Sequence, residues 1–282
     1  MMSLTPTPTL KSPKVQMSEL DEYLNFAKEL AKKAGEIMSL SFANGTSREW
    51  KEDRTPVTEA DTKINSLVIE RIKAKYPDHG VWGEEESHNL GVQMTWVCDP
   101  VDGTMPFSHG LPISTFALAL ARDGQPIVGV VYDPFMKRMF YAAKGTGAYL
   151  NGDRIQVSDK DDLKDALLDE EGLRDSTKPV IPTGDGYIEE LIEAGARPLK
   201  LWAVVLPSAL VAAGEFTATI FNVPKPEDGA AIKIIVEEAG GKVTDLFGNE
   251  QRYDQPTKGY IASNGKVHQQ LVDIIARHKD SQ

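Results

Sequence analysis

The segment WVCDPVDGTMPFSHGLP, residues 96–112, places two aspartates three positions apart where an apolar run ends. Asp-Pro and Asp-Gly are common turn formers, so one interpretation of Asp99 and Asp102 is an ordinary turn after a buried strand. The other is that the DPVD spacing puts both carboxylates on one side of a turn, with the Val101 carbonyl between them pointing the same way. Such a set of hard oxygen ligands suits Mg²⁺ or Mn²⁺ and does not suit zinc.

The residues that follow this segment alternate as β-strands do. Between Trp96 and Val157, the runs STFALALA, IVGVVYD and RMFYAA are separated or followed by the turn signals RDGQP, KGTG and NGD. Short apolar runs divided by such turns predict an antiparallel meander. Before it, apolar residues recur at helical spacing over Ser18–Phe42 and over Glu59–Tyr76, so two amphipathic helices are expected there.

The C-terminal part of the chain has a different pattern. Residues 158–200 are polar and irregular, whereas LWAVVLPSALVAAGEF after them predicts a strand and then a buried helix. The remaining pattern predicts strands at ATIFNV, Lys242–Asp245 and Tyr260–Ala262, and helices at Asp228–Ala239 and Lys266–Lys279. We expect three parts: a disordered tail over 1–17, an α+β domain over 18–160 and an α/β domain over 161–282.

Composition and charge limit the partners of the 282-residue chain. Hydrophobic content of 41% and charged content of 26% are typical of a globular protein. The net charge of −11 would repel a phosphate backbone, so nucleic acid is not expected. No apolar segment approaches the ~18 residues of a membrane span. The tail lacks the apolar core of a signal peptide and Cys98 is the only cysteine, so we expect a cytoplasmic protein without a thiolate metal cage.

Four acidic sites lie at the edges of expected elements, where chains often project catalytic groups. Each has a structural explanation: Asp61 in TPVTEAD as part of a helix cap, Glu84 in GEEES as a solvated loop residue, and Asp228 as a helix start. The Asp99–Asp102 pair is again explained by a turn. If four carboxylates converged at ~4 Å, each like-charged pair would cost on the order of 4 kcal/mol, against a total stability of ~5 to 15 kcal/mol. Such a cluster needs protons or cations, and magnesium meets that need.

The Gly-Thr pair after Asp102 fits a phosphate site beside these carboxylates. Gly103 lets the backbone approach an anion closely, and if a helix follows, its first N–H groups point at that anion. The Thr104 hydroxyl is placed to hold a water with help from Glu84 or Asp61. Two metal ions ~3.5 to 4 Å apart would polarise such a water in an in-line displacement.

The motifs TPVTEAD, GEEES, WVCDPVDGT, the meander from GVVYDP to GAYLNG, and DGAAIKIIVEEAGG occur in one order. In this the chain resembles the inositol monophosphatase superfamily of lithium-sensitive, metal-dependent phosphatases, from about Leu20 to the C-terminus. The resemblance implies an α+β / α/β fold, the αβαβα layered sandwich of the inositol monophosphatase and fructose bisphosphatase type. It also implies hydrolysis of a small soluble phosphate monoester by a metal-activated water, with two or three Mg²⁺ ions or Mn²⁺ as an alternative, in a homodimer.

The metal ligands follow from the same resemblance. Glu84, Asp99 and the Val101 carbonyl are implied for the first ion. Asp99, Asp102 and Asp228 are implied for the second. A third, weaker ion is implied near Glu84 and Asp61.

The resemblance also assigns the catalytic and phosphate-binding residues. Thr104, linked to Asp61 and Glu84, would position the nucleophilic water, and the N–H groups of Gly103 and Thr104 would hold the phosphate. Lys51, ten residues before Asp61, is expected to assist near the metal entrance, or else to be an exposed, solvated lysine.

Three positions depart from the family pattern. Pro106 replaces a common asparagine, Glu227 replaces a common tryptophan, and Phe221 stands where inositol-cleaving relatives place an acidic residue. Metal chemistry survives these changes, but inositol specificity does not follow. The leaving-group side is expected to include Ser208, Ala209, Phe221, Asn222 and the loop 172–187, unless these are ordinary packing and loop residues.

Other classes of function fit less well. A serine hydrolase usually has a G-x-S-x-G turn, which is absent, and the sequence neighbours Ser108 and His109 are not expected to face each other. The histidines show no H-E-x-x-H spacing, and GTG at 145–147 is not a dinucleotide fingerprint. Histidinol phosphate, a sugar phosphate and a nucleotide bisphosphate stay open as substrates beside inositol phosphate. A non-catalytic relative that only binds metal and phosphate also stays open.

Overall fold

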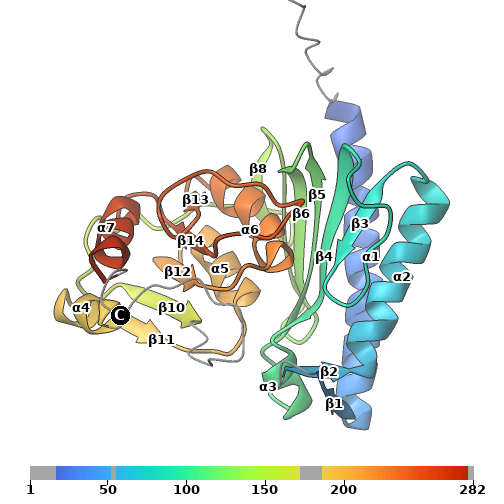
Figure 1. Ribbon diagram of the computed structural model, residues 1–282, viewed down its shortest axis with the longest axis horizontal. Helices are drawn as coiled ribbons and strands as arrows, with labels where there is room; N and C mark the ends of the chain where they lie inside the picture. Colours follow the sequence, from blue (N-terminus) through green and yellow to red (C-terminus); the bar gives the residue numbers. More distant parts are fainter. Residues whose placement is uncertain (1–16, 52–54, 172–185, 279–282) are drawn as a thin grey trace, which may run out of the picture.

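A computed structural model describes residues 17–51, 55–171 and 186–278 of the chain. Two long helices, α1 (Met17–Asn44) and α2 (Glu59–Lys75), cover one face of a seven-stranded sheet (Figure 1). Its strands, in spatial order, are β3 (Gly80–Gly83), β4 (Met94–Asp102), β5 (Thr115–Arg122), β6 (Gln125–Asp133), β7 (Arg138–Ala143), β8 (Gly147–Leu150) and β9 (Asp153–Ile155). β3 and β4 are parallel, and every later pair is antiparallel.

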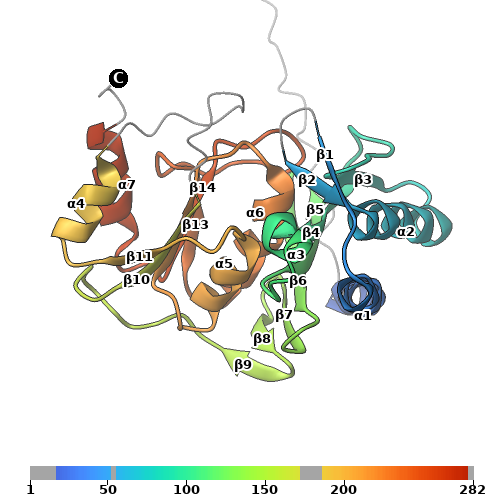
Figure 2. The ribbon, with the colours of Figure 1, turned by 90° about the horizontal axis from the view of Figure 1, so that it is seen from below.

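A second, five-stranded sheet lies beyond the first. Its order is β11 (Arg197–Leu199), β10 (Leu167–Glu171), β12 (Ala218–Phe221), β14 (Tyr260–Ser263) and β13 (Lys242–Thr244). Helices α5 (Val205–Ala212) and α6 (Pro226–Glu238) pack between the two sheets, while α4 (Tyr187–Glu193) and α7 (His268–His278) cover the outer face (Figures 1 and 2). The layers therefore alternate helix, sheet, helix, sheet, helix, which confirms the αβαβα sandwich.

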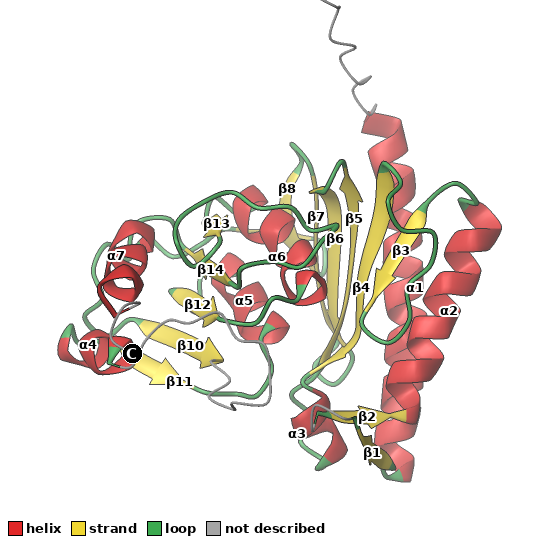
Figure 3. Cartoon of the chain, viewed as in Figure 1, coloured by secondary structure: helices red, strands yellow, loops and turns green. Residues whose placement is uncertain are grey.

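Two small elements complete the fold beside the end of β4. β1 (Arg48–Trp50) and β2 (Pro56–Thr58) form an antiparallel ribbon, and the short helix α3 (Thr104–Ser108) follows β4 directly (Figure 3). Since β2 leads straight into α2, this corner joins the start of α2 to the end of β4. The motif TPVTEAD, residues 55–61, and the pair Asp99 and Asp102 come together there.

The meander owes its two packed faces to strict alternation. Along β5, Phe116, Leu118 and Leu120 pack under α1 and α2, whereas the alanines between them face α5 and α6. Small residues on that second face allow the middle helices to approach the sheet closely. The meander and both N-terminal helices are thus confirmed, with α1 extending to Asn44.

Gly129 in β6 is a test of this close approach. A Cβ atom there would lie 2.5 Å from Ile234 Cγ2 and 2.9 Å from the Ala231 carbonyl oxygen on α6. We expect Gly129→Ala to lower the free energy of unfolding by about 1 to 3 kcal/mol, because α6 must move away from the sheet. Chemical denaturation measures this. If Ile234 is the obstacle, Ile234→Ala should lower the free energy of unfolding less in the Gly129→Ala protein than in the wild type. Strictly additive losses of unfolding free energy would contradict the steric explanation.

The C-terminal half contains one wrong prediction and several confirmed ones. No strand forms at 201–204. This segment instead connects the edge strand β11, which ends at Leu199, to α5, which begins at Val205. The helix beginning near Asp228 and the strands at 218–221, 242–244 and 260–263 are confirmed. The region 158–200, which showed no clear pattern, contains β10, α4 and β11 in its described part.

The expected boundaries at residues 17 and 160 stay predictions. Residues 1–16 lie outside the described ranges, and Met17 is already part of α1. Helices of the 161–282 part pack against the first sheet, so both parts share the middle helical layer. Among the helices of the described ranges, none is both long enough and apolar enough to cross a membrane.

Candidate active site

A bulge at the end of β4 brings Asp99 and Asp102 to the same face of the sheet. Asp99 pairs with Ala117 and Asp102 with Thr115, so three steps along β4 match two along β5. In a regular strand, side chains three positions apart point to opposite faces, and one extra residue reverses this. The two carboxylates do lie on one side, as predicted. The backbone that carries them, however, is a bulged strand and not a turn.

Asp228 approaches this pair from the first turn of α6, more than a hundred residues later in the chain. One carboxylate oxygen from each of Asp99, Asp102 and Asp228 lies within 4.8 Å of the others. All three residues are buried. Burial and the charge of nearby carboxylates raise the pKa of Asp99 well above its usual range, and burial raises the pKa of Asp228 to about 7. Buried carboxylate oxygens this close together are a set of donors that suits a hard divalent cation.

Asp102 also fixes the start of α5. Its carboxylate accepts hydrogen bonds from the backbone N–H groups of Val204, Val205 and Leu206 at 2.8, 3.1 and 3.3 Å. Burial raises the pKa of Asp102 to about 6, although these three donors oppose the shift. Within 201–204, the backbone N–H groups of Leu201, Trp202 and Val204 donate to the side chains of Asp169, Glu171 and Asp102. They therefore do not pair this segment with a neighbouring strand.

Two lysines surround Glu84, which follows β3. The Lys225 ammonium lies 2.7 Å from Glu84 Oε1, and Lys51 lies 3.7 Å from the same oxygen and 2.5 Å from Glu85. Burial alone would raise the pKa of Glu84, but the two ammonium groups outweigh it and lower the pKa. Lys51 is therefore half-buried and ion-paired with Glu84 and Glu85, although it does not line the cavity described below. Sequence reasoning missed Lys225, although it lies only three residues before Asp228.

Asp61 serves two functions at once. Its Oδ2 accepts hydrogen bonds from the Thr58 N–H at 2.9 Å and the Thr58 hydroxyl at 2.5 Å, which caps α2. Its Oδ1 lies 3.2 Å from the Thr104 hydroxyl, which is also 2.9 Å from the Val101 carbonyl oxygen. Burial raises the pKa of Asp61 to about 7. The Asp61 side chain thus caps α2 with one oxygen and contacts Thr104 with the other.

Gly103 forms the start of α3 in a conformation that glycine favours. Its φ is +76°, and a Cβ atom there would lie 2.6 Å from the Ile113 carbonyl oxygen. α3 begins at the next residue, as the phosphate-site interpretation requires. The first N–H groups of a helix have no partner within that helix, so they are directed to whatever lies before it.

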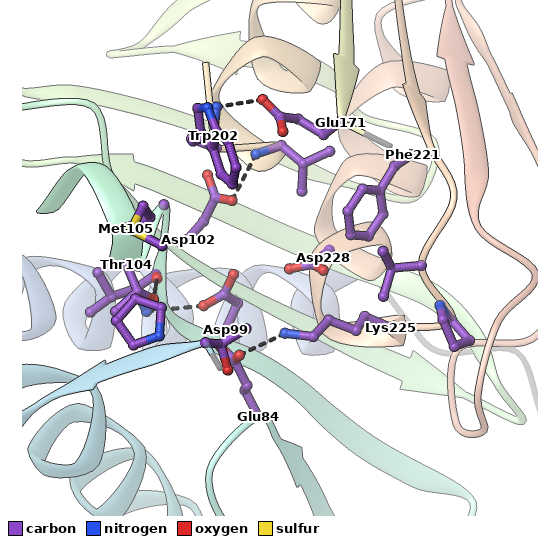
Figure 4. A pocket seen from close by; sticks show the side chains of 18 residues that line it. Glu84, Asp99, Asp102, Thr104, Met105, Glu171, Trp202, Phe221, Lys225 and Asp228 are labelled. Carbon is purple, nitrogen blue, oxygen red and sulfur yellow. Dashed lines mark hydrogen bonds and ion pairs between the residues drawn. The ribbon is translucent and has the colours of Figure 1, made fainter. Parts of the chain in front are cut away.

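These groups line one cavity of about 330 Å³ (Figure 4). Glu84, Asp99, Asp102, Thr104 and Asp228 line one end of it. The lining also includes residues that sequence reasoning missed, Met105, Glu171, Trp202 and Val223, together with Phe221, which it had named. Figure 4 shows Trp202, Glu171 and Phe221 at the end away from Glu84. No local motif marks the missed residues, since they come from four separate segments.

The other residues expected on the leaving-group side lie elsewhere. Ser208 and Ala209 are fully buried in α5, where the Ser208 hydroxyl donates to the Val204 carbonyl at 2.7 Å. Asn222 is buried after β12, and residues 172–185 of the expected loop lie outside the described ranges. Glu227, at the position of a common tryptophan, accepts a hydrogen bond from Trp82 Nε1 at 3.1 Å.

Ser108 and His109 do contact each other, contrary to expectation. The Ser108 hydroxyl lies 3.2 Å from His109 Nδ1, and both atoms lie within 3.0 Å of the Met105 carbonyl oxygen. The common acceptor explains the contact, because each side chain folds back on the last turn of α3. Neither residue is among those that line the cavity.

Comparison with known proteins identifies the family of the chain. Residues 19–280 match the model of the inositol monophosphatase family. A fructose-1,6-bisphosphatase/inositol-1-monophosphatase of Thermotoga maritima is 32% identical over 253 residues, which are 89% of this chain and 95% of that protein. A histidinol-phosphatase of Chlorobaculum parvum is 33% identical over 258 residues, 89% of this chain and 96% of that protein.

Solved structures show the same fold. An IMPase structure from Thermotoga maritima superposes with a TM-score of 0.81 at 32% identity, covering 91% of this chain and 97% of that one. The inositol monophosphatase of Anabaena (Nostoc) sp. PCC 7120 gives 0.80 at 28% identity, covering 92% and 97%. The chain belongs to the inositol monophosphatase family, a family of metal-dependent phosphatases that hydrolyse phosphate monoesters.

Proposed function

We propose that this protein is a Mg²⁺-dependent phosphatase that hydrolyses a small phosphate monoester by direct attack of water, without a phosphoenzyme. The observation that carries the proposal is the meeting of Asp99, Asp102 and Asp228, with their oxygens within 4.8 Å, beside Thr104 and the start of α3. The relatives named as phosphatases of fructose bisphosphate, inositol phosphate and histidinol phosphate support this class of reaction.

The donor set fits divalent ions that prefer oxygen. Glu84, Asp99 and the Val101 carbonyl would hold one ion, and Asp99, Asp102 and Asp228 a second, with a weaker third near Glu84 and Asp61. Mg²⁺ is favoured because every side-chain donor is a carboxylate, and Mn²⁺ is the alternative. When bound, such ions supply the positive charge that activates an attacking water and stabilises the departing oxygen.

The remaining steps belong to the protein's own residues. If the Thr104 hydroxyl donates to Asp61, its lone pairs can accept a hydrogen bond from the water and turn the water's oxygen toward phosphorus, while Asp61 is within one hydrogen bond of taking the proton that the hydroxyl passes on. The N–H groups of Gly103 and Thr104, at the start of α3, would hold the phosphoryl oxygens. Glu84, held in place by ion pairs with Lys225 and Lys51, would be the further carboxylate next to the attacking water.

A phosphate-release assay tests the proposal. The panel consists of inositol 1-phosphate, histidinol phosphate, fructose 1,6-bisphosphate and a nucleoside 3′,5′-bisphosphate, each with Mg²⁺ and with a chelator. We expect Mg²⁺-dependent release from at least one ester and none in the chelator. Binding of phosphate and metal without turnover of any ester would instead indicate a non-catalytic relative.

Three further properties are proposed on the family resemblance. We expect inhibition by lithium, a homodimer and a cytoplasmic location; the last also rests on the single, buried Cys98. Sedimentation analysis of the purified protein tests the dimer, and a lithium titration of the phosphate-release assay tests the inhibition.

A further inference from the structure

The end of the cavity away from Glu84 is lined mainly by apolar side chains. Trp202 and Phe221 line it, and Glu171 contributes a carboxylate (Figure 4). If the phosphate lies against Asp99, Asp228 and α3, as the proposed function requires, the alcohol part of the ester lies at this end. Its walls therefore indicate which alcohol fits.

Trp202 is an unusual residue for this place. It has a φ of +58°, in the left-handed region that side-chain-bearing residues rarely adopt, and it is 52% exposed. An exposed indole on a strained backbone gains little from packing, and glycine or asparagine would suit that backbone better. Strain of this kind is retained mainly at functional sites.

Neighbouring groups hold Trp202 at the rim of the cavity. Its backbone N–H donates to the Glu171 carboxylate at the end of β10, and the Lys200 ammonium lies 5.2 Å from its ring centroid. The Glu171 side chain is nearly buried. The backbone of Trp202 is thus fixed to the end of β10, and its ring lies beside the Lys200 ammonium.

Phe221 forms a second fixed aromatic wall. It is the last residue of β12, it is 7% exposed, and its ring packs against Tyr260 at a centroid distance of 5.6 Å. Figure 4 shows Trp202 and Phe221 on either side of Glu171 at this end of the cavity. Two aromatic rings and one carboxylate leave few partners for an alcohol with many hydroxyl groups, and each buried hydroxyl without a partner weakens binding.

We propose that the alcohol part of the substrate carries a planar ring that packs on Trp202 and Phe221 and directs an N–H or O–H donor at Glu171. This inference rests on the proposed function and narrows its substrate class to ring-bearing esters over polyol phosphates. A planar ring matches aromatic walls by stacking, while the single carboxylate fixes its orientation. The cavity volume of about 330 Å³ accommodates one ring and one phosphate.

Three esters test the inference: 2-(imidazol-4-yl)ethyl phosphate, inositol 1-phosphate, and glycerol 2-phosphate as a reference without a ring. We expect kcat/KM for the imidazole ester to exceed that for inositol 1-phosphate by about tenfold or more. Equal or faster hydrolysis of inositol 1-phosphate would overturn the inference and leave the proposed function intact. If none of the three esters is hydrolysed, the inference on turnover is overturned, the wider panel described above decides whether the proposed function holds, and the binding experiment below tests the ring site directly.

Variants of Trp202 separate ring binding from folding. In Trp202→Ala, the ratio of kcat/KM for the imidazole ester to that for glycerol 2-phosphate should fall by about tenfold, and Trp202→Phe should retain most of it. Trp50→Ala is the matched control, because Trp50 is 55% exposed but does not line the cavity. An unchanged ratio in Trp202→Ala, or an equal fall in Trp50→Ala, would contradict the inference.

Two more measurements do not depend on turnover. Titration with 2-(imidazol-4-yl)ethanol and phosphate should change tryptophan fluorescence in the wild type and not in Trp202→Phe. Trp202→Gly should keep a thermal midpoint equal to or above the wild type, because glycine adopts this φ without strain. A midpoint lower by several degrees would show that Trp202 is retained for folding, against the inference.

Discussion

Asp228→Asn is expected to lower kcat/KM for the preferred ester by about 100-fold or more, because an amide is a weak ligand for the divalent cation that would supply positive charge beside the phosphate. The fold should survive. Burial raises the pKa of Asp228 to about 7, which means that the ionised carboxylate is disfavoured in the folded protein. At pH 8 in a chelator, the variant should therefore be as stable as the wild type or more stable.

Addition of Mg²⁺ makes the comparison sharper. A cation that binds only the folded state stabilises it, so Mg²⁺ should raise the thermal midpoint of the wild type and raise that of Asp228→Asn much less. Glu84→Gln and Asp99→Asn are expected to lose most activity in the same way. A variant that keeps near wild-type turnover would remove its residue from the proposed site.

Asp133→Asn is the matched control for these substitutions. Asp133 is equally buried, but its carboxylate accepts bonds from Arg138 at 2.9 and 3.0 Å and from two backbone N–H groups after β6. Its loss should lower the free energy of unfolding by about 1 to 3 kcal/mol, since charged hydrogen bonds disappear. Activity should be retained. Loss of the structural aspartate should therefore lower the free energy of unfolding, whereas loss of the proposed metal ligand should not.

Local periodicity predicted the parts of the fold whose burial follows a simple repeat. The residues Phe116 to Ala121 alternate because both faces of β5 are covered, and α1 shows one continuous apolar stripe. β10 was missed because its sequence, LLDEE, is short and ends in three acidic residues. The strand predicted at 201–204 failed for a nonlocal reason, since carboxylates of β10 and β4 bind three of its backbone N–H groups.

The candidate site was predictable to the extent that its residues lie in motifs. The sequence placed five acidic residues at element ends. The structure gathers Glu84, Asp99, Asp102 and Asp228 around one cavity, and Asp61 contacts Thr104, which also lines it. Lys225, Glu171 and Trp202 were not found, because only the tertiary fold brings α5, β10 and the start of α6 to the end of β4. Substitutions of these residues are therefore the most direct test of which ester the site prefers.

His268 gives the second large effect, on the pH dependence of stability. It is 1% exposed, and its imidazole lies between the Ser263 hydroxyl, 2.8 Å from Nδ1, and the Thr244 hydroxyl, 2.9 Å from Nε2. Burial, with the charges of Lys242 and Lys233, lowers its pKa to about 4. An unfolded histidine titrates near ~6.5, so below that pH the unfolded chain binds a proton that the folded protein does not.

The stability contributed by neutral His268 is therefore complete above pH 6.5 and is lost as the pH falls toward 4. Linkage gives a loss of about 2 kcal/mol between pH 7.5 and pH 5. Urea denaturation at both values measures it, with His268→Gln as the comparison, because glutamine keeps hydrogen-bonding groups but has no proton to gain. The acidic cluster changes stability in both proteins alike, so their difference isolates His268. The drop should be smaller in the variant by about 2 kcal/mol, and equal drops would mean that His268 does not resist protonation in the folded state.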